Sequence, residues 1–118
     1  EAFGPVSTIM PYQDIDDAVA LANAGQGSLV MSLFSHDPAV VAAMVSGSSI
    51  FHGRMMIVDR DSAADATGHG AALPHLQHGG PGRAGGGAEL GGILGMMPYL
   101  QRTALQAAPA TLDILKGL

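Results

Sequence analysis

The chain has 118 residues, of which 47% are hydrophobic and only 13% are charged, and its formal net charge is −5. An acidic balance without basic clusters argues against a protein that binds nucleic acid or an anionic membrane surface. The absence of cysteine excludes disulfides, cysteine–zinc sites and a thiol nucleophile within these residues. No apolar run approaches the roughly 18 residues that a membrane span needs, and the length allows one domain at most.

The first half of the chain alternates segments with the character of strands and of helices. Acidic side chains at positions 14–17 suit a helix N-terminus because they complement its dipole and its free N–H groups. The uninterrupted apolar run SLVMSLFS predicts a strand that is buried on both faces. The expected elements are a strand at 6–12, a helix from Asp14 to a stop at Gly25, a strand at 28–35, a helix from Asp37–Pro38 to residues 47–49, and a strand at 53–58.

This β-α-β-α-β order favours an α/β fold with parallel strands joined by crossover helices. Regular pattern is lost over residues 59–92, and nine of the 17 residues from 79 to 95 are glycine, which predicts a long loop. After this loop the sequence predicts a short helix at 89–99, a strand at 101–107 and a short terminal helix at 111–118.

The glycine-rich loop contains a G-x-G-x-x-G pattern at residues 80–85. A dinucleotide fingerprint needs a strand immediately before this pattern and an acidic residue about 20 positions later. Here Pro74 and His78 precede the pattern, and Leu105 occupies the later position. The loop is therefore interpreted as a structural anchor rather than a phosphate cradle.

Two further groups in this region carry residue types used in chemistry. His69, His75 and His78 lie six and three positions apart, but a zinc site needs a fourth ligand in a regular framework. We expect these rings to hydrogen-bond the loop backbone, and the sequence predicts no metal site. Ser62, Asp65 and His69 supply the residue types of a nucleophilic triad, yet they crowd into one loop without a G-x-S-x-G turn.

The methionines and the acidic residues near position 15 have structural interpretations. The methionines fall on predicted strands and helices and are expected to fill the core, where the flexible thioether suits irregular gaps. They are Met10, Met31, Met44, Met55, Met56, Met96 and Met97. Asp14, Asp16 and Asp17 are interpreted as helix-start residues and not as a catalytic carboxylate pair.

The first five residues, E-A-F-G-P, form a short and distinctive motif just before a predicted strand. The Glu1 carboxylate can accept paired hydrogen bonds from a ribose diol, and the Phe3 ring can pack on a planar ring or a sugar. Gly4–Pro5 fixes a turn that aims both side chains. Glu1 and Phe3 are therefore the candidate ligand-binding residues.

With this motif the sequence resembles the aldehyde dehydrogenase superfamily, and the resemblance spans essentially all 118 residues. Residues 1–6 are similar to its E-x-F-G-P-V cofactor motif, and Asn23 with Gly27–Leu29 is similar to the next segment. Residues 78–91 resemble a family loop that reads approximately F-G-G-x-K-x-S-G-x-G-R-E-x-G. The glycines and Glu89 fall in register, but the family's Lys, Ser and Arg positions hold Gly82, Ala84 and Ala88.

The divergent positions point to one branch of this superfamily. Residues 67–70, 73–74, 78–87 and 99–104 resemble the bifunctional proteins of aerobic phenylacetate degradation, in which a dehydrogenase domain precedes a hydratase that opens an oxepin-CoA ring. The semialdehyde dehydrogenases of aerobic benzoyl-CoA degradation share the H-G-G-P-G-R loop and are the alternative. A second alternative, on sequence pattern alone, is a small independent α/β binding or structural module.

The resemblance implies that residues 1–118 are the C-terminal segment of a dehydrogenase domain that oxidises a CoA-linked semialdehyde with NADP or NAD in the cytoplasm. It implies that Glu1 binds the nicotinamide-side ribose, that Phe3 packs near the nicotinamide, and that the strand near 101–107 forms a homo-oligomer interface. The family's catalytic cysteine and main dinucleotide-binding domain lie upstream of the E-x-F-G-P motif. We therefore expect this chain to need the upstream remainder of its domain and to be inactive alone.

Overall fold

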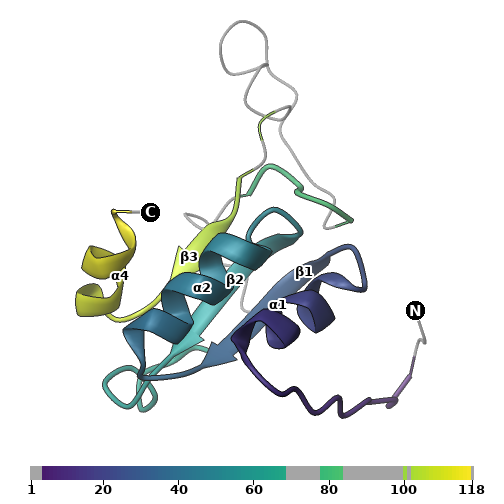
Figure 1. The fold of residues 1–118 in the computed structure, drawn as a ribbon. Coiled ribbons are helices and arrows are strands. Elements are labelled where there is room, and N and C mark those ends of the chain that lie inside the picture. Colours follow the sequence, from purple (N-terminus) through teal and green to yellow (C-terminus); the bar gives the residue numbers. More distant parts are fainter. Residues whose placement is uncertain (1–3, 69–77, 84–99, 101, 118) are drawn as a thin grey trace, which may run out of the picture.

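The computed structural model describes residues 4–68, 78–83, 100 and 102–117 (Figure 1). The elements in these ranges are α1 (Ile15–Asn23), β1 (Ser28–Phe34), α2 (Pro38–Ser48), β2 (His52–Val58), β3 (Ala104–Gln106) and α4 (Pro109–Leu115). The expected α/β class is confirmed.

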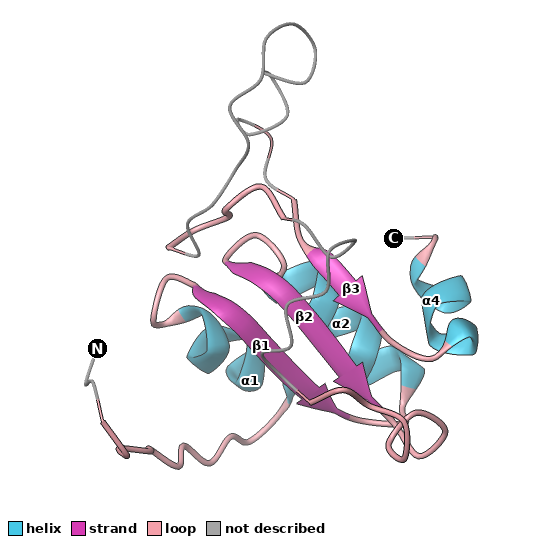
Figure 2. Cartoon of the chain, turned by 180° about the vertical axis from the view of Figure 1, so that it is seen from behind, coloured by secondary structure: helices cyan, strands magenta, loops and turns pink. Residues whose placement is uncertain are grey.

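The three strands form one parallel sheet in the order β1-β2-β3. In register, Met31 of β1 lies opposite Met55 of β2, which lies opposite Leu105 of β3. Helices α1 and α2 cover one face of this sheet, and the opposite face is turned toward the viewer in Figure 2. Because the strands are parallel, the carboxyl ends of β1 and β2 meet at one edge of the sheet.

The two long helices begin where the acidic residues predict. Asp14 caps α1 by accepting a hydrogen bond from Asp17 N at 2.9 Å, while Asp17 Oδ2 accepts one from Gln13 N at 3.1 Å. Asp37 caps α2 through Ala39 N at 2.8 Å, and Pro38 occupies the first turn, where its missing N–H is not needed. These contacts satisfy amide donors that have no partner within the helix.

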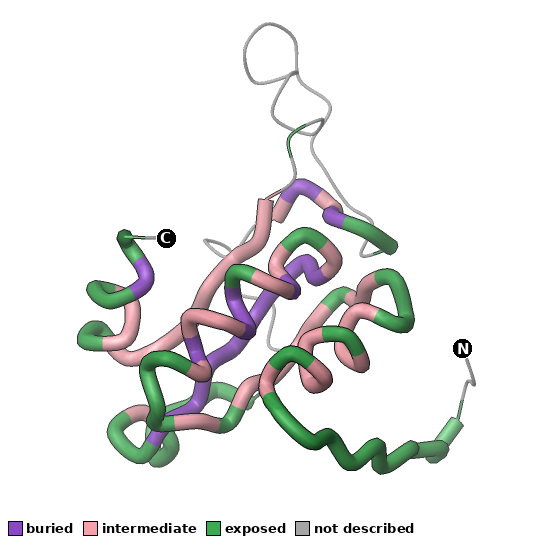
Figure 3. Tube along the Cα trace, in the orientation of Figure 1, coloured by how far each residue is buried: buried purple, intermediate pink, exposed green. Residues whose placement is uncertain are grey.

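The core lies between the sheet, α2 and α4. Its buried members are Val41, Val45, Met55, Ile57 and Leu115, with Met31, Leu33, Leu105 and Ala107 packed against them. All seven residues of β2 are buried, as the continuous dark band in Figure 3 shows. A central parallel strand is shielded on both faces and by both neighbours, which accounts for this burial.

The prediction that 28–35 is buried on both faces is wrong. Strand β1 is the edge of the described sheet, and its Leu29 and Phe34 side chains are 63% and 70% exposed. An apolar run of strand length does not tell a central strand from an edge strand, because periodicity reports apolar character and not the number of neighbouring strands. The buried central strand is β2, which carries His52 and Arg54 among its apolar residues.

The predicted strand at 6–12 is also wrong. Residues 6–12 form neither helix nor strand and are exposed throughout, Ile9 at 94%. A strand needs a partner that takes up its amide and carbonyl groups, and Pro5 and Pro11 provide no amide donors. The helix–strand alternation therefore starts at α1 within the described residues. Met10, which was expected in the core, is 53% exposed for the same reason.

The C-terminal elements confirm the predicted types with shifted boundaries. Strand β3 is shorter than the predicted 101–107, and α4 starts and ends earlier than the predicted 111–118. Residues 59–68 and 78–83 contain no helix or strand, which confirms the loop prediction for those stretches. The predicted helix at 89–99, with Met96 and Met97, lies outside the described residues.

Thr103 fastens the start of β3 to the turn between α2 and β2. Its hydroxyl contacts the carbonyl oxygen of Ser49 and lies 2.8 Å from that of His52. This contact fixes β3 beside β2. Among the helices in the described part of the chain, none has the length and apolar character needed to cross a membrane.

Candidate functional site

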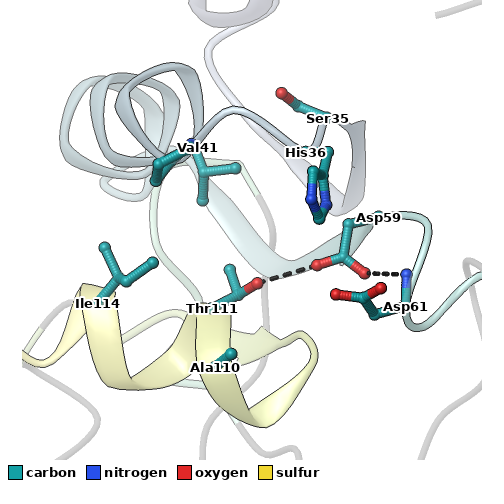
Figure 4. Close-up of a pocket in the computed structure, with 9 residues that line it drawn as sticks. Ser35, His36, Val41, Asp59, Asp61, Ala110, Thr111 and Ile114 are labelled. Carbon is teal, nitrogen blue, oxygen red and sulfur yellow. Dashed lines mark hydrogen bonds between the residues drawn. The ribbon is translucent and has the colours of Figure 1, made fainter.

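A cavity of about 220 Å³ opens at the carboxyl ends of β1 and β2 (Figure 4). In open α/β sheets this is the edge where ligands bind. The chain leaves β1 through Ser35 and His36 and leaves β2 through Asp59 and Asp61, so both connections place polar side chains at the rim. Helix α4 closes the other side with Thr111 and Ile114.

Asp59 is the polar side chain lining this cavity that makes the most hydrogen bonds within the described residues. Its Oδ1 accepts hydrogen bonds from the backbone amides of Asp61 and Ser62 at 3.0 and 2.9 Å, and from the Ser62 hydroxyl at 2.9 Å. Its Oδ2 accepts one from Thr111 Oγ1 at 3.0 Å. These bonds, above all the one from the Ser62 hydroxyl, hold the pKa of the Asp59 carboxyl below its ordinary value. The group is therefore an anchored carboxylate that is 8% exposed.

His36 and Asp61 share this cavity with Asp59. One ligand atom from each of the three side chains lies within 4.8 Å of the other two. Figure 4 shows the His36 ring and the Asp61 carboxylate on either side of the Asp59 carboxylate. The arrangement presents one ring nitrogen and two carboxylate oxygens to the same space.

Residues 78–83, the described part of the glycine-rich loop, lie at the other end of the strands, near the amino ends of β1 and β2. Gln26 O accepts a hydrogen bond from Arg83 N at 3.0 Å, and Gly79 N donates to Arg102 O at 3.3 Å. His78 Nδ1 accepts one from Gly80 N at 3.1 Å, which confirms for this histidine the predicted bond to loop backbone. Over residues 78–83 the contacts are those of an anchor loop.

His52 is buried at the start of β2 and titrates below the usual range. The Ser28 hydroxyl donates its one hydrogen to Val30 O, so His52 Nδ1–H donates to Ser28 Oγ at 2.9 Å. Nε2 is then the unprotonated nitrogen, and it is buried without a partner among the described residues. Burial lowers the pKa of His52 from its ordinary value of 6.5, because protonation would place a charge there.

We expect the fold to lose stability as the pH falls below about 6.5. The unfolded chain takes up a proton at His52 near its ordinary pKa, whereas the folded chain takes it up only at lower pH, so protonation favours unfolding in between. The urea concentration at the midpoint of unfolding should decrease as the pH is lowered from about 7 to about 5. The substitution His52→Gln should reduce this pH dependence. His36→Gln, a change at an exposed histidine, is the control and should retain it. An equal pH dependence in the His52 variant would contradict the assignment.

The structure describes some of the candidate residues from the sequence and leaves others outside the described ranges. Glu1 and Phe3, the candidate cofactor ligands, lie outside the described residues, as do His69 and His75. The triad arrangement finds no support at Ser62, because its hydroxyl bonds to Asp59.

His36, Asp59 and Asp61 belong to none of the sequence motifs described above. A usable signal was present, because each follows one of two consecutive parallel strands within a few residues, and such positions converge at one sheet edge.

The sequence pattern of the aldehyde dehydrogenase family matches residues 1–104. The chain belongs to the aldehyde dehydrogenase family. Its parallel α/β sheet is consistent with part of an aldehyde dehydrogenase fold.

Three relatives of this aldehyde dehydrogenase chain are informative. It is 50% identical over 112 residues to "Protein MaoC" of Klebsiella aerogenes, covering 95% of this chain and 33% of the relative. It is 51% identical over 81 residues to a 3,4-dehydroadipyl-CoA semialdehyde dehydrogenase of Aromatoleum evansii, covering 69% of this chain and 16% of the relative. It is 30% identical over 105 residues to aldehyde dehydrogenase LUC3 of a Fusarium species, covering 89% of this chain and 20% of the relative. The chain thus spans a third or less of the length of these relatives.

Proposed function

We propose that the protein carrying this chain is an NAD(P)-dependent aldehyde dehydrogenase that oxidises a CoA-linked semialdehyde to the acid. The observation that carries the substrate class is the 51% identity to the 3,4-dehydroadipyl-CoA semialdehyde dehydrogenase. Family membership over residues 1–104 supports the reaction class. We also propose a cytoplasmic location, which the family resemblance implies.

Within this class, we propose the semialdehyde formed by oxepin-CoA ring opening in phenylacetate degradation as the substrate. The support is the sequence resemblance of residues 73–74 and 99–104. A 3,4-dehydroadipyl-CoA semialdehyde is the second candidate, favoured by the name of the Aromatoleum relative. Steady-state kinetics of the full-length protein with both thioesters, following reduction of the nicotinamide, separates the two. Turnover of neither would contradict the proposal.

In this proposal, residues 1–118 are the C-terminal segment of the dehydrogenase domain and act with the remainder of that domain. The bound nicotinamide supplies the hydride acceptor, and this segment supplies Glu1 toward the ribose and Phe3 toward the ring. These residues contain no cysteine, so the 118-residue chain alone should not oxidise an aldehyde.

Two surfaces support the proposed partners. The described sheet ends at β1 on one side, where Leu29 and Phe34 are exposed, and we propose that the remainder of the domain covers this edge. The described sheet ends at β3 on the other side, and we propose that residues 101–107 form the homo-oligomer interface there.

Replacing Glu1 with glutamine in the full-length protein should weaken NAD(P) use by roughly tenfold or more. A carboxylate makes stronger hydrogen bonds to a diol than an amide, which is a mixed donor and acceptor. The measurements are cofactor affinity by calorimetry and the rate of nicotinamide reduction. Asp16→Asn, at an exposed position in the first turn of α1, is the charge-matched control and should change neither. Unchanged values for Glu1→Gln would remove Glu1 from the cofactor site.

A further inference from the structure

The side chains of His36, Asp59 and Asp61 form a mixed donor set inside the cavity at the carboxyl ends of β1 and β2. They come from two connections that the parallel sheet brings together, and not from one continuous acidic stretch. A ring nitrogen and two carboxylates on one side of a cavity are a frequent ligand set for divalent first-row metal ions, since imidazole and carboxylate both bind them well.

The set combines one fixed ligand with two adjustable ligands. Four hydrogen bonds fix the Asp59 carboxylate, but only the one from Thr111 engages Oδ2, which retains a lone pair. His36 and Asp61 are exposed, and within the described ranges no hydrogen bond engages their side chains. Ligand atoms of a zinc site lie roughly 3–3.5 Å apart, as metal–ligand distances near 2.0–2.1 Å require. Because the ligand atoms already lie within 4.8 Å of one another, rotation of the two exposed side chains is the movement that would bring them to that spacing.

Within residues 4–68, 78–83, 100 and 102–117, no ion pair joins a basic side chain to Asp59 or Asp61. The carboxylates of Asp59 and Asp61 therefore face each other and the His36 ring without a paired cation in this part of the chain. Two neighbouring carboxylates repel each other, and a divalent cation between them would remove that repulsion.

We propose that His36, Asp59 and Asp61 bind a divalent first-row metal ion such as Zn²⁺ at the carboxyl ends of β1 and β2. The remaining coordination positions face the 220 Å³ cavity, which has room for water or a small ligand. Mg²⁺ is expected to bind more weakly, because it favours oxygen ligands and gains little from an imidazole. This site departs from the sequence-based expectation of no metal, which considered only His69, His75 and His78.

The test is calorimetric titration of Zn²⁺ into the full-length, untagged protein after treatment with a chelator, with Mg²⁺ titrated in parallel. We expect a saturable site that depends on the set, with His36→Gln and Asp61→Asn each weakening it by roughly tenfold or more. These two positions are exposed, so circular dichroism should show unchanged folding. Asp65→Asn, a charge-matched change at another exposed position of the same loop, should leave Zn²⁺ binding unchanged.

Three results would overturn the proposal. The first is the absence of saturable Zn²⁺ binding. The second is Zn²⁺ binding that survives both His36→Gln and Asp61→Asn, which would assign the ion to other residues of the protein. The third is equal affinity for Mg²⁺ with no effect of His36→Gln, which would indicate a pair of carboxylates without a metal-binding imidazole. Because no readout uses aldehyde oxidation, failure here is distinguishable from failure of the proposed enzymatic function.

Discussion

Replacing Gly27 with alanine should lower the free energy of unfolding by roughly 2–5 kcal/mol. Gly27 has a φ of +123°, and a Cβ atom built on it would lie 2.2 Å from Phe51 O and 2.7 Å from Arg83 N. Both neighbours are backbone atoms that cannot rotate away, so the added methyl group must displace the turn before β2 or the backbone at Arg83. The backbone strain at positive φ adds to this clash.

Gly25 is the matched control for this substitution. It lies two residues earlier in the same connection, and a Cβ atom there would meet nothing within 4 Å. We expect Gly25→Ala to change the free energy of unfolding by less than about 0.5 kcal/mol, the usual range for an unconstrained surface position. Urea unfolding of both variants in the full-length protein gives the comparison. Equal stability of the two variants would mean that the loop at residues 78–83 does not pack as closely against this turn as described.

Truncating Met55 to alanine should cost roughly 2–5 kcal/mol of folding free energy. Met55 is fully buried at the centre of β2 and lies in register with Met31 and Leu105 of the neighbouring strands. Removing most of its side chain leaves a cavity between the sheet and α2 that the surrounding strands cannot fill without breaking their pairing. The loss therefore combines the transfer free energy of the side chain with the cost of the cavity.

Met10→Ala removes the same atoms from an exposed position and serves as the control. Met10 is 53% exposed in a segment without helix or strand, so its truncation should change stability little. The measurement is again the urea dependence of unfolding by circular dichroism. A large loss at position 10 would contradict the description of Met10 as an exposed residue outside the core.

Local chemistry explains which elements the sequence predicted well. Helices α1 and α2 were located because Asp14 and Asp37 cap them through short-range hydrogen bonds that depend only on nearby residues. The strands at 28–34 and 52–58 follow from apolar runs bounded by turns. The anchoring role of His78 and the adjoining glycines also followed from local composition.

The failures concern properties that depend on distant parts of the chain. The segment 6–12 has the composition of a strand but lacks a partner among the described residues, and β1 is exposed at Leu29 and Phe34 because it has one described neighbour. The grouping of His36 with Asp59 and Asp61 depends on the parallel pairing of β1 and β2, which brings together residues separated by more than 20 positions. A fixed spacing along the sequence does not reveal that convergence, whereas the position of each residue just after a predicted parallel strand does.

The hydrogen bond between Thr111 and Asp59 bears on which insertions and deletions the fold can accept. These residues lie 52 positions apart, and their bond joins the exit of β2 to the start of α4, while Thr103 fastens the entry of β3 to the turn before β2. The long excursion between β2 and β3 is thus closed at its base by two threonine hydroxyls. Loop-closure entropy rises by only about 0.6 kcal/mol for each doubling of length. Insertions and deletions in that excursion, outside the anchored residues 78–83, should therefore cost little stability, and these are the positions where the fold can acquire new specificity without rebuilding its core.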